Sequence, residues 1–135
     1  MLIIGAGLER SGGVQLIVQT IAPHLATLPP LVTLVAIYAI SSVLTELVTN
    51  NAVAVLMAPI ALGLAAQIGV DPRPFLIAVM IGASASFATP IGYQTNTLVY
   101  GAGNYRFTDF LKVGVPMNVA VGVASCAAIW FWYGL

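Results

Sequence analysis

The stretch that decides the fold is LTELVTNNA, residues 44–52, which places a carboxylate, two threonines and two asparagines inside an apolar run. Mostly apolar sequence continues on both sides, and it predicts helices over residues 31–48 and 52–67. Each leg reaches about 25 Å at ~1.5 Å per residue, which nearly spans a ~30 Å hydrocarbon core. Periodicity therefore leaves two forms open, a hairpin that crosses the membrane and a re-entrant hairpin whose tip stops in mid-membrane.

A second polar interruption, ATPIGYQTN at residues 88–96, follows a helix predicted over residues 75–87. Pro90 and Gly92 open the helix there, and it resumes through about Tyr100. Non-helical backbone cannot face lipid, so it is tolerated where it lines a cavity or site. Paired interruptions of this kind indicate a transporter site, because half-helix N-termini attract anions and opened carbonyls bind Na⁺. The alternative is an ordinary turn at Asn50 and a simple proline kink at Pro90.

The composition excludes a soluble domain. Hydrophobic residues make up 60% of the chain, charged residues 6%, and the mean hydropathy is +1.03. Soluble domains carry about 25% charged residues. Uncharged stretches at residues 11–45, 47–70, 74–105 and 113–135 each exceed the ~18 residues that mark a membrane-spanning helix. The chain is therefore predicted to be a multi-pass, all-α integral membrane protein, and its zero net charge gives no indication of nucleic-acid binding.

The remaining segments complete the expected organisation. Residues 1–7 read as the end of a helix without a signal-peptide pattern, and the prolines from Pro23 to Pro30 predict a break. His24 is expected in an interfacial loop, with a proton-relay role as the alternative. Thr108 is the expected N-cap of a final span over residues 113–133.

Residues 44–52, followed by Pro59, resemble the second hairpin signature of the divalent anion:sodium symporter family, whose members carry dicarboxylates, citrate or sulfate. Residues 89–101 resemble the second unwound loop of the same family, which belongs to the ion transporter superfamily. Two departures concern the substrate. TNN replaces the usual Ser-Asn-Thr, and Gln94 and Thr95 replace Pro-Pro, which is more like members assigned to sulfate or unknown anions.

The resemblance implies the second half of an inverted-repeat transporter. Residues 1–28 would be the end of a scaffold helix and a connecting segment, 29–69 a re-entrant hairpin, 70–112 a broken transmembrane helix with an interfacial loop, and 113–135 the last transmembrane helix. The first repeat would be missing, so the chain is expected to be a C-terminal fragment of a transporter that forms a homodimer in an inner or plasma membrane.

The resemblance also assigns residues to the site. Na⁺ is the expected coupling ion, without any cofactor, and its ligands, partly through backbone carbonyls, would be Thr45, Val48, Asn50, Gly92, Tyr93 and Asn96. The anion would be contacted by Thr49, Asn50, Asn51 and Thr95. Because neither motif contains Arg or Lys, anion binding should depend on helix dipoles and on bound sodium.

The role of Glu46 distinguishes between the candidate functions. It is expected to be a buried polar brace capped within the hairpin, or else a proton or cation partner. Sodium-coupled anion transport is the predicted function. The alternatives are a sodium/proton antiporter, an oxyanion efflux permease of the same superfamily, and a membrane anchor without transport activity. An enzyme is not expected, because the sequence has no HExxH motif and no Ser/His/Asp set.

Overall fold

The computed structural model describes residues 3, 7, 10–25 and 27–135, and the regular elements in this part of the chain are α-helices. They are α2 (Gly13–Leu25), α3 (Pro30–Thr45), α4 (Asn50–Ile68), α5 (Arg73–Ser84), α6 (Gln94–Gly103) and α7 (Phe107–Tyr133). By length and composition α4 and α7 are able to cross a membrane. These findings confirm the predicted all-α membrane class. The expectation for residues 1–7 falls mostly outside the described residues.

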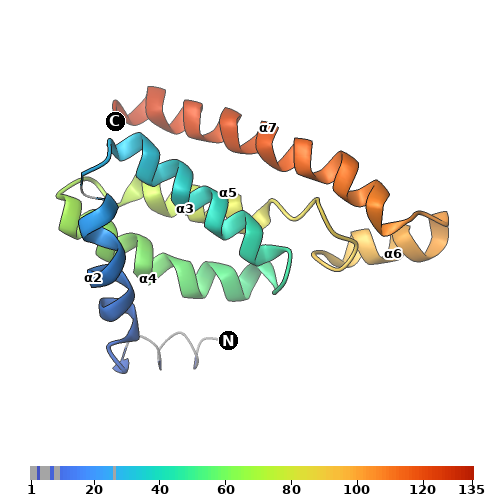
Figure 1. The fold of residues 1–135 in the computed structure, drawn as a ribbon, viewed down its shortest axis with the longest axis horizontal. Helices are drawn as coiled ribbons and strands as arrows, with labels where there is room; N and C mark the ends of the chain where they lie inside the picture. The colour runs from blue at the N-terminus through green and yellow to red at the C-terminus, as the bar shows by residue number, and fades with distance from the viewer. Residues whose placement is uncertain (1–2, 4–6, 8–9, 26) are drawn as a thin grey trace.

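The helices form a bundle with α3 and α5 at its centre (Figure 1). One side of this pair is covered by α4 and the other by α7, while α6 lies beyond its end, near the start of α7. The core is closely packed, since Leu34, Val53 and Phe75 are fully buried. At Gly82 the backbones of α3 and α5 approach so closely that a Cβ atom there would lie 2.9 Å from the Tyr38 carbonyl oxygen.

The two legs of the predicted hairpin are α3 and α4, but their turn begins three residues earlier than expected. We call residues 46–49 the hairpin turn. The second leg begins at Asn50 because Thr49 is its N-cap, with the Thr49 hydroxyl oxygen accepting from the Ala52 N–H at 3.4 Å. The first leg ends at Thr45 because the next residue, Glu46, bonds outside the hairpin.

At the second predicted interruption the structure has two helices, α5 and α6, separated by residues 85–93, which we call the unwound segment. It also begins three residues early. The last carbonyls of α5 have no intrahelical partner, and hydroxyls from α3 bind the chain there. The Thr45 hydroxyl lies 2.7 Å from the Ala83 carbonyl oxygen, and the Ser42 hydroxyl donates to the Ala85 carbonyl at 3.2 Å.

The expected start of the last helix is wrong, whereas the predicted break is present, between the end of α2 at Leu25 and the start of α3 at Pro30. Thr108 lies inside α7, whose N-cap is Arg106, because the Asp109 carboxylate accepts from the Arg106 N–H at 2.9 Å and closes the first turn. Pro23 lies inside α2, where it removes only one hydrogen bond near the end of the helix. His24 is accordingly an exposed residue of the last turn of α2 rather than a loop residue.

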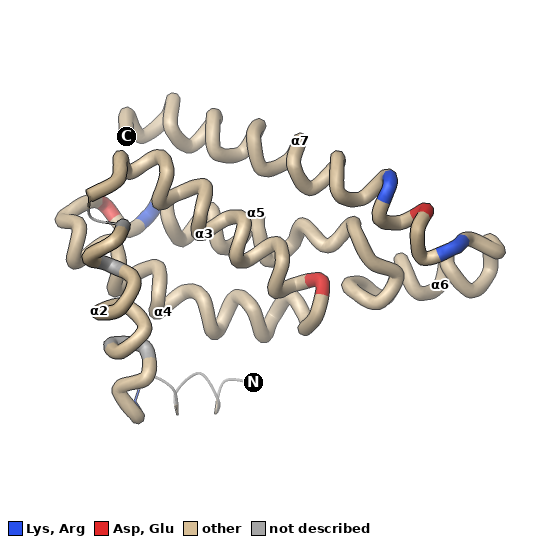
Figure 2. Tube along the Cα trace, viewed as in Figure 1, with Lys and Arg blue, Asp and Glu red and all other residues tan. Residues whose placement is uncertain are grey.

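Charged residues gather near the ends of the bundle, as Figure 2 shows for the described part of the chain. The exception is one acidic residue at the turn between α3 and α4. This residue is Glu46, and its side chain is only 8% exposed.

Candidate functional site

Glu46 joins three elements. Its carboxylate accepts hydrogen bonds from the backbone N–H groups of Ala88 at 2.8 Å and Thr89 at 2.9 Å, from the Thr89 hydroxyl at 2.8 Å, and from the Asn118 side-chain amide at 3.0 Å. All four partners donate, which suits an ionised carboxylate because that group only accepts. The carboxylate therefore ties the hairpin turn to the unwound segment and to α7.

The brace predicted at Glu46 is thus confirmed, but the expectation that it is capped within the hairpin is wrong. Its partners lie 42 to 72 residues away in sequence. A short turn leaves few free N–H groups, whereas the unwound segment exposes N–H groups that no helix uses. The buried carboxylate takes these donors instead.

The unwound segment is held by side chains from itself and from the first turn of α6. The Asn96 amide donates to the carbonyls of Ser86 at 2.8 Å and Thr89 at 3.0 Å, and the Thr97 hydroxyl donates to the Pro90 carbonyl at 2.7 Å. The Thr89 hydroxyl oxygen accepts from the Gly92 N–H at 3.0 Å. The opened backbone is therefore ordered by specific polar contacts, which non-helical backbone within a membrane protein requires because lipid offers it no partners.

Oxygen atoms from the two helix ends beside the hairpin turn and from the end of α5 converge at Thr45. The Thr45 hydroxyl oxygen lies 2.6 Å from the Asn50 side-chain oxygen and 2.7 Å from the Ala83 carbonyl oxygen. One hydroxyl hydrogen serves only one of these acceptors at a time. The result is a cluster of three oxygens at the end of α5, directly beside the hairpin turn.

The structure brings some of the predicted site residues together. Thr45 and Asn50 are in contact, and Gly92 lies against Glu46, since a Cβ atom on Gly92 would be 2.8 Å from the Glu46 Oε2 atom. Asn96 joins this group through the Thr89 carbonyl. The remaining predicted residues have exposed side chains: Val48, Thr49, Asn51, Tyr93 and Thr95. Asn50 and Asn51 also line a cavity of about 330 Å³ between α4 and α5.

Sequence reasoning missed the Ala88 and Thr89 N–H groups, the Ala83 carbonyl and Asn118. The sequence does not show which backbone groups form such contacts. Asn118, however, can be found from the sequence, because it is the only amide side chain in the apolar stretch 113–135. A polar residue of this kind within a membrane helix indicates a buried partner.

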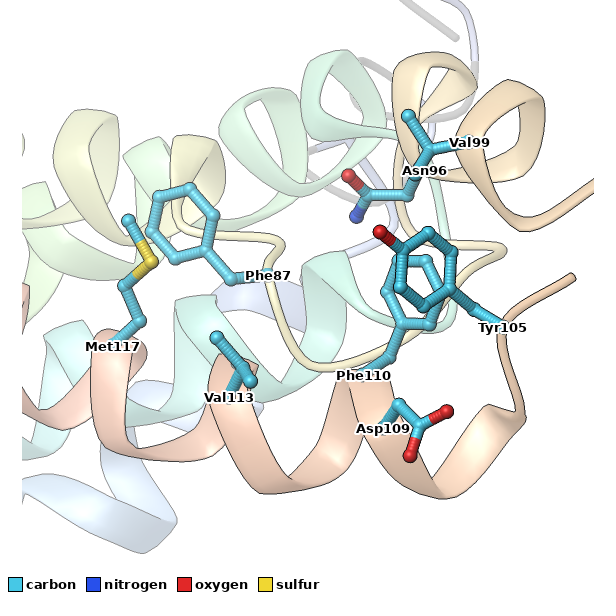
Figure 3. Close-up of a pocket in the computed structure, with 9 residues that line it drawn as sticks. Phe87, Asn96, Val99, Tyr105, Asp109, Phe110, Val113 and Met117 are labelled. Carbon is cyan, nitrogen blue, oxygen red and sulfur yellow. The ribbon is translucent and has the colours of Figure 1, made fainter. Parts of the chain in front are cut away.

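A larger cavity of about 380 Å³ lies on the other side of the unwound segment, between α6 and the first half of α7 (Figure 3). Asn96 and Tyr105 lie at one end of it, and Phe87 and Met117 lie at the other. Phe110 packs edge-on against Tyr105, with ring centroids 6.2 Å apart. The wall is mostly apolar, and Asn96 connects this cavity to the polar contacts of the unwound segment.

Comparison with known proteins identifies the family. A sequence model of the family described as "Citrate transporter" matches residues 1–134. The chain is 40% identical over 132 residues to an uncharacterized transporter of Synechocystis, covering 98% of this chain and 22% of that protein. It is 45% identical over 86 residues to sodium/sulfate cotransporter 1 of Chlamydomonas reinhardtii, covering 64% of this chain and 10% of that protein.

A third relative is the Na(+)/citrate cotransporter of Rattus norvegicus, 30% identical over 119 residues that cover 88% of this chain and 20% of that protein. The chain spans about a fifth of the length of the Synechocystis relative. The predicted resemblance is confirmed, as is the prediction of a membrane-integral protein. The chain belongs to the citrate transporter family.

Proposed function

We propose that this chain supplies the second half of a site for secondary active transport, where an anion, sulfate or a di- or tricarboxylate, crosses the membrane together with Na⁺. The observation that carries the proposal is the meeting of two helix interruptions, the hairpin turn and the unwound segment, at the buried carboxylate of Glu46. A pair of this kind is the arrangement on which inverted-repeat transporters build their sites. The sodium/sulfate and sodium/citrate names of two relatives support the same substrates.

The length of α7 supports a re-entrant hairpin. Asn118, which contacts Glu46, is the twelfth of the 27 residues of α7. At ~1.5 Å per residue, about 17 Å of helix precede it and about 22 Å follow it. If the apolar residues 113–133 of α7 cross the membrane, Asn118 lies five residues, about 8 Å, inside the hydrocarbon core. The hairpin turn that contacts Asn118 then also lies inside the core, and the first leg of 16 residues ends there without crossing.

The oxygen cluster at Thr45 supports a sodium site. In our proposal Thr45 and Asn50 bind Na⁺ with side-chain oxygens, Val48, Gly92 and Tyr93 contribute carbonyls, and Asn96 orders the unwound segment or contributes its amide oxygen. Na⁺ is a hard cation that prefers oxygen ligands. Glu46 lies beside this group, and its four hydrogen-bond donors are all neutral. A cation near Thr45 would therefore be attracted by a carboxylate whose charge these donors do not neutralise.

Two helix N-termini support the anion site. Thr49, Asn50 and Asn51 lie at the start of α4, and Thr95 lies in the first turn of α6. Neither helix has an acidic residue in its first turn. Free N–H groups and the helix dipole favour negative charge at such positions. The exposed side chains of Thr49, Asn51 and Thr95 are available to an anion held between this half and the rest of the transporter.

Sodium/proton antiport receives less support. It requires a carboxylate that exchanges protons with water, and Glu46 is the only carboxylate at either interruption. That side chain is 8% exposed and its oxygens already accept four hydrogen bonds. A group fixed in this way serves as a structural anion.

The proposal is tested by reconstituting the full transporter that contains this segment into liposomes. Uptake of labelled sulfate, succinate and citrate is measured with an inward sodium gradient and with potassium in its place. Uptake of at least one anion that depends on the sodium gradient supports the proposal. Equal uptake in sodium and potassium for all three anions contradicts it.

Asn50→Ala and Asn96→Ala should each raise the sodium concentration that gives half-maximal uptake. Asn50→Ala removes an oxygen ligand, and Asn96→Ala releases the Ser86 and Thr89 carbonyls. The loss of one bond to a charged group corresponds to ~1.5–3 kcal/mol, so we expect a shift of about tenfold or more. Uptake is measured against sodium concentration at matched membrane expression.

Asn104→Gly is the control. Asn104 is exposed and has a φ of 54°, which glycine adopts without strain, so its replacement should leave the sodium dependence unchanged. Wild-type sodium dependence in both the Asn50 and Asn96 variants would remove these residues from the sodium site.

A further inference from the structure

We propose that Asn118 is a positioning residue of the transport site, which acts through Glu46 to set how closely the hairpin turn approaches the unwound segment. In this way Asn118 adjusts sodium binding without contacting the ion. The inference rests on the proposed function, and it assigns part of the site to α7, a helix without any of the predicted site residues.

Asn118 contacts the hairpin at two points. Its side-chain amide donates to the Glu46 Oε1 atom at 3.0 Å, and its backbone carbonyl accepts from the Tyr38 hydroxyl at 2.8 Å. Tyr38 belongs to α3, and Glu46 follows the end of α3. One residue of α7 therefore fixes both the leg and the turn of the hairpin.

The face of α7 around Asn118 allows a close approach. Gly114, Asn118 and Gly122 are spaced by four residues, so they lie on one face of the helix. A Cβ atom on Gly114 would overlap the backbone of Phe87 and Ala88, and one on Gly122 would overlap the Tyr38 ring. The two glycines bring α7 against the unwound segment and against α3, and the Asn118 amide lies between these two contacts.

The orientation of the amide is imposed by Glu46. The Asn118 Oδ1 atom is buried, and no described residue donates to it. The flipped amide would place that oxygen against the carboxylate, which repels it. Leaving a buried acceptor unsatisfied costs free energy. An apolar side chain of the same size would avoid this cost, so the contribution of Asn118 to the structure is its donor to Glu46.

Glu46 passes this contact on to the sodium residues. One of its oxygens faces Asn118, while the other accepts from Thr89 and lies against Gly92. It also directly follows Thr45, whose hydroxyl oxygen belongs to the oxygen cluster. If the bond to Asn118 is lost, the carboxylate is less fixed, and the distance between Thr45 and Gly92 is no longer set. Sodium should then bind more weakly, although every proposed ligand is still present.

The test compares Asn118→Ala and Asn118→Ser with wild type in the full transporter, at matched membrane expression. Sodium concentration at half-maximal uptake and maximal rate at saturating sodium are measured for each. Because Asn118 donates to a charged acceptor, we expect the half-saturating sodium concentration to rise about fivefold or more. The maximal rate should stay within about twofold of wild type, since high sodium restores the bound state. Val119→Ala, an exposed neighbour on α7, is the matched control.

A double-mutant cycle with Glu46→Gln tests whether Asn118 acts through Glu46. In the Glu46→Gln background, Asn118→Ala should cause a much smaller further shift, because the contact is already altered. Asn118→Asp places two carboxylates together and should be the most damaging single change. Adding Glu46→Gln to Asn118→Asp should improve it, because a glutamine amide then donates to the new carboxylate. If position 118 had only a structural role, Glu46→Gln would not be expected to improve the Asn118→Asp variant.

The outcomes separate the two proposals. Sodium-driven uptake in wild type with unchanged half-saturation in both Asn118→Ala and Asn118→Ser would overturn the role of Asn118 alone. Additive effects in the double-mutant cycle would overturn it as well. If Asn118→Ala does not reach the membrane, Asn118→Ser and the Glu46→Gln, Asn118→Asp pair decide the question. Wild-type uptake that does not respond to sodium would overturn the proposed function, and this inference with it.

Discussion

Glu46→Ala should reduce uptake at least tenfold and lower the melting temperature of the full transporter. The change leaves the N–H groups of Ala88 and Thr89 and the Asn118 amide buried without their acceptor. Each unsatisfied donor costs about 1–3 kcal/mol, so the total loss is about 3 kcal/mol or more. That is a large fraction of the ~5–15 kcal/mol that stabilises a typical domain. Thermal unfolding in detergent and uptake in liposomes measure the two effects.

Two further variants serve as comparisons for Glu46→Ala. Glu46→Gln keeps the size of the side chain and one acceptor oxygen, so it should fall between wild type and alanine. Asp71→Ala removes a carboxylate that accepts an exposed hydrogen bond from the Arg73 N–H, and it should lower stability by less than about 1 kcal/mol. Wild-type melting and uptake in Glu46→Ala would contradict the bracing role.

Gly114→Ala should also impair transport strongly. The added Cβ atom would overlap the Phe87 carbonyl and lie 2.5 Å from the Ala88 Cα atom. These are backbone atoms, which cannot rotate away as a side chain can. Relief requires α7 to move away from the unwound segment, and this movement lengthens the bond between Asn118 and Glu46. Overpacking of this kind costs about 1–3 kcal/mol or more, and we expect a fall in melting temperature together with reduced uptake.

Gly101→Ala is the matched control for Gly114→Ala. Gly101 also lies within a helix, but no atom lies within 4 Å of the position its Cβ would occupy. Alanine is favoured over glycine in helices by up to ~1 kcal/mol, so this variant should be neutral or slightly stabilising. Equal stability and uptake of the two variants would show that the close approach at Gly114 is not required.

The sequence was sufficient to predict the class of fold and the existence of both interruptions, because apolar runs and clustered polar residues are local signals. The sequence was not sufficient to predict the residues at which the helices end. Both α3 and α5 end three residues before the expected positions. The cause is tertiary, since Thr45 and Ser42 bind the end of α5 across 38 and 43 residues of sequence, and Glu46 binds the unwound segment. Propensity within a window carries no information on such contacts.

The start of α7 was predicted incorrectly for a different reason. Cap propensity alone favours Thr108 as the N-cap, because its side chain is a good acceptor, yet the helix begins before it. The stabilising group is the Asp109 carboxylate, which reaches back to the Arg106 N–H. An acidic residue three positions after the N-cap is a readable signal. The contact from Asp109 therefore places the start of α7 two residues before the position that cap propensity favours.

The bond between Glu46 and Asn118 has a consequence for biogenesis. The two residues are 72 positions apart, so at roughly 5–20 residues per second a ribosome makes Asn118 about 4–14 s after Glu46. During that interval the carboxylate has not yet received the amide of α7, and an incompletely solvated charge is unfavourable in lipid. Until α7 has been synthesised, the tip of the nascent hairpin should therefore remain in water or in the protein-conducting channel. Its final insertion then depends on the arrival of the last helix, so truncation before Asn118 should leave the newly made chain with an unassembled hairpin.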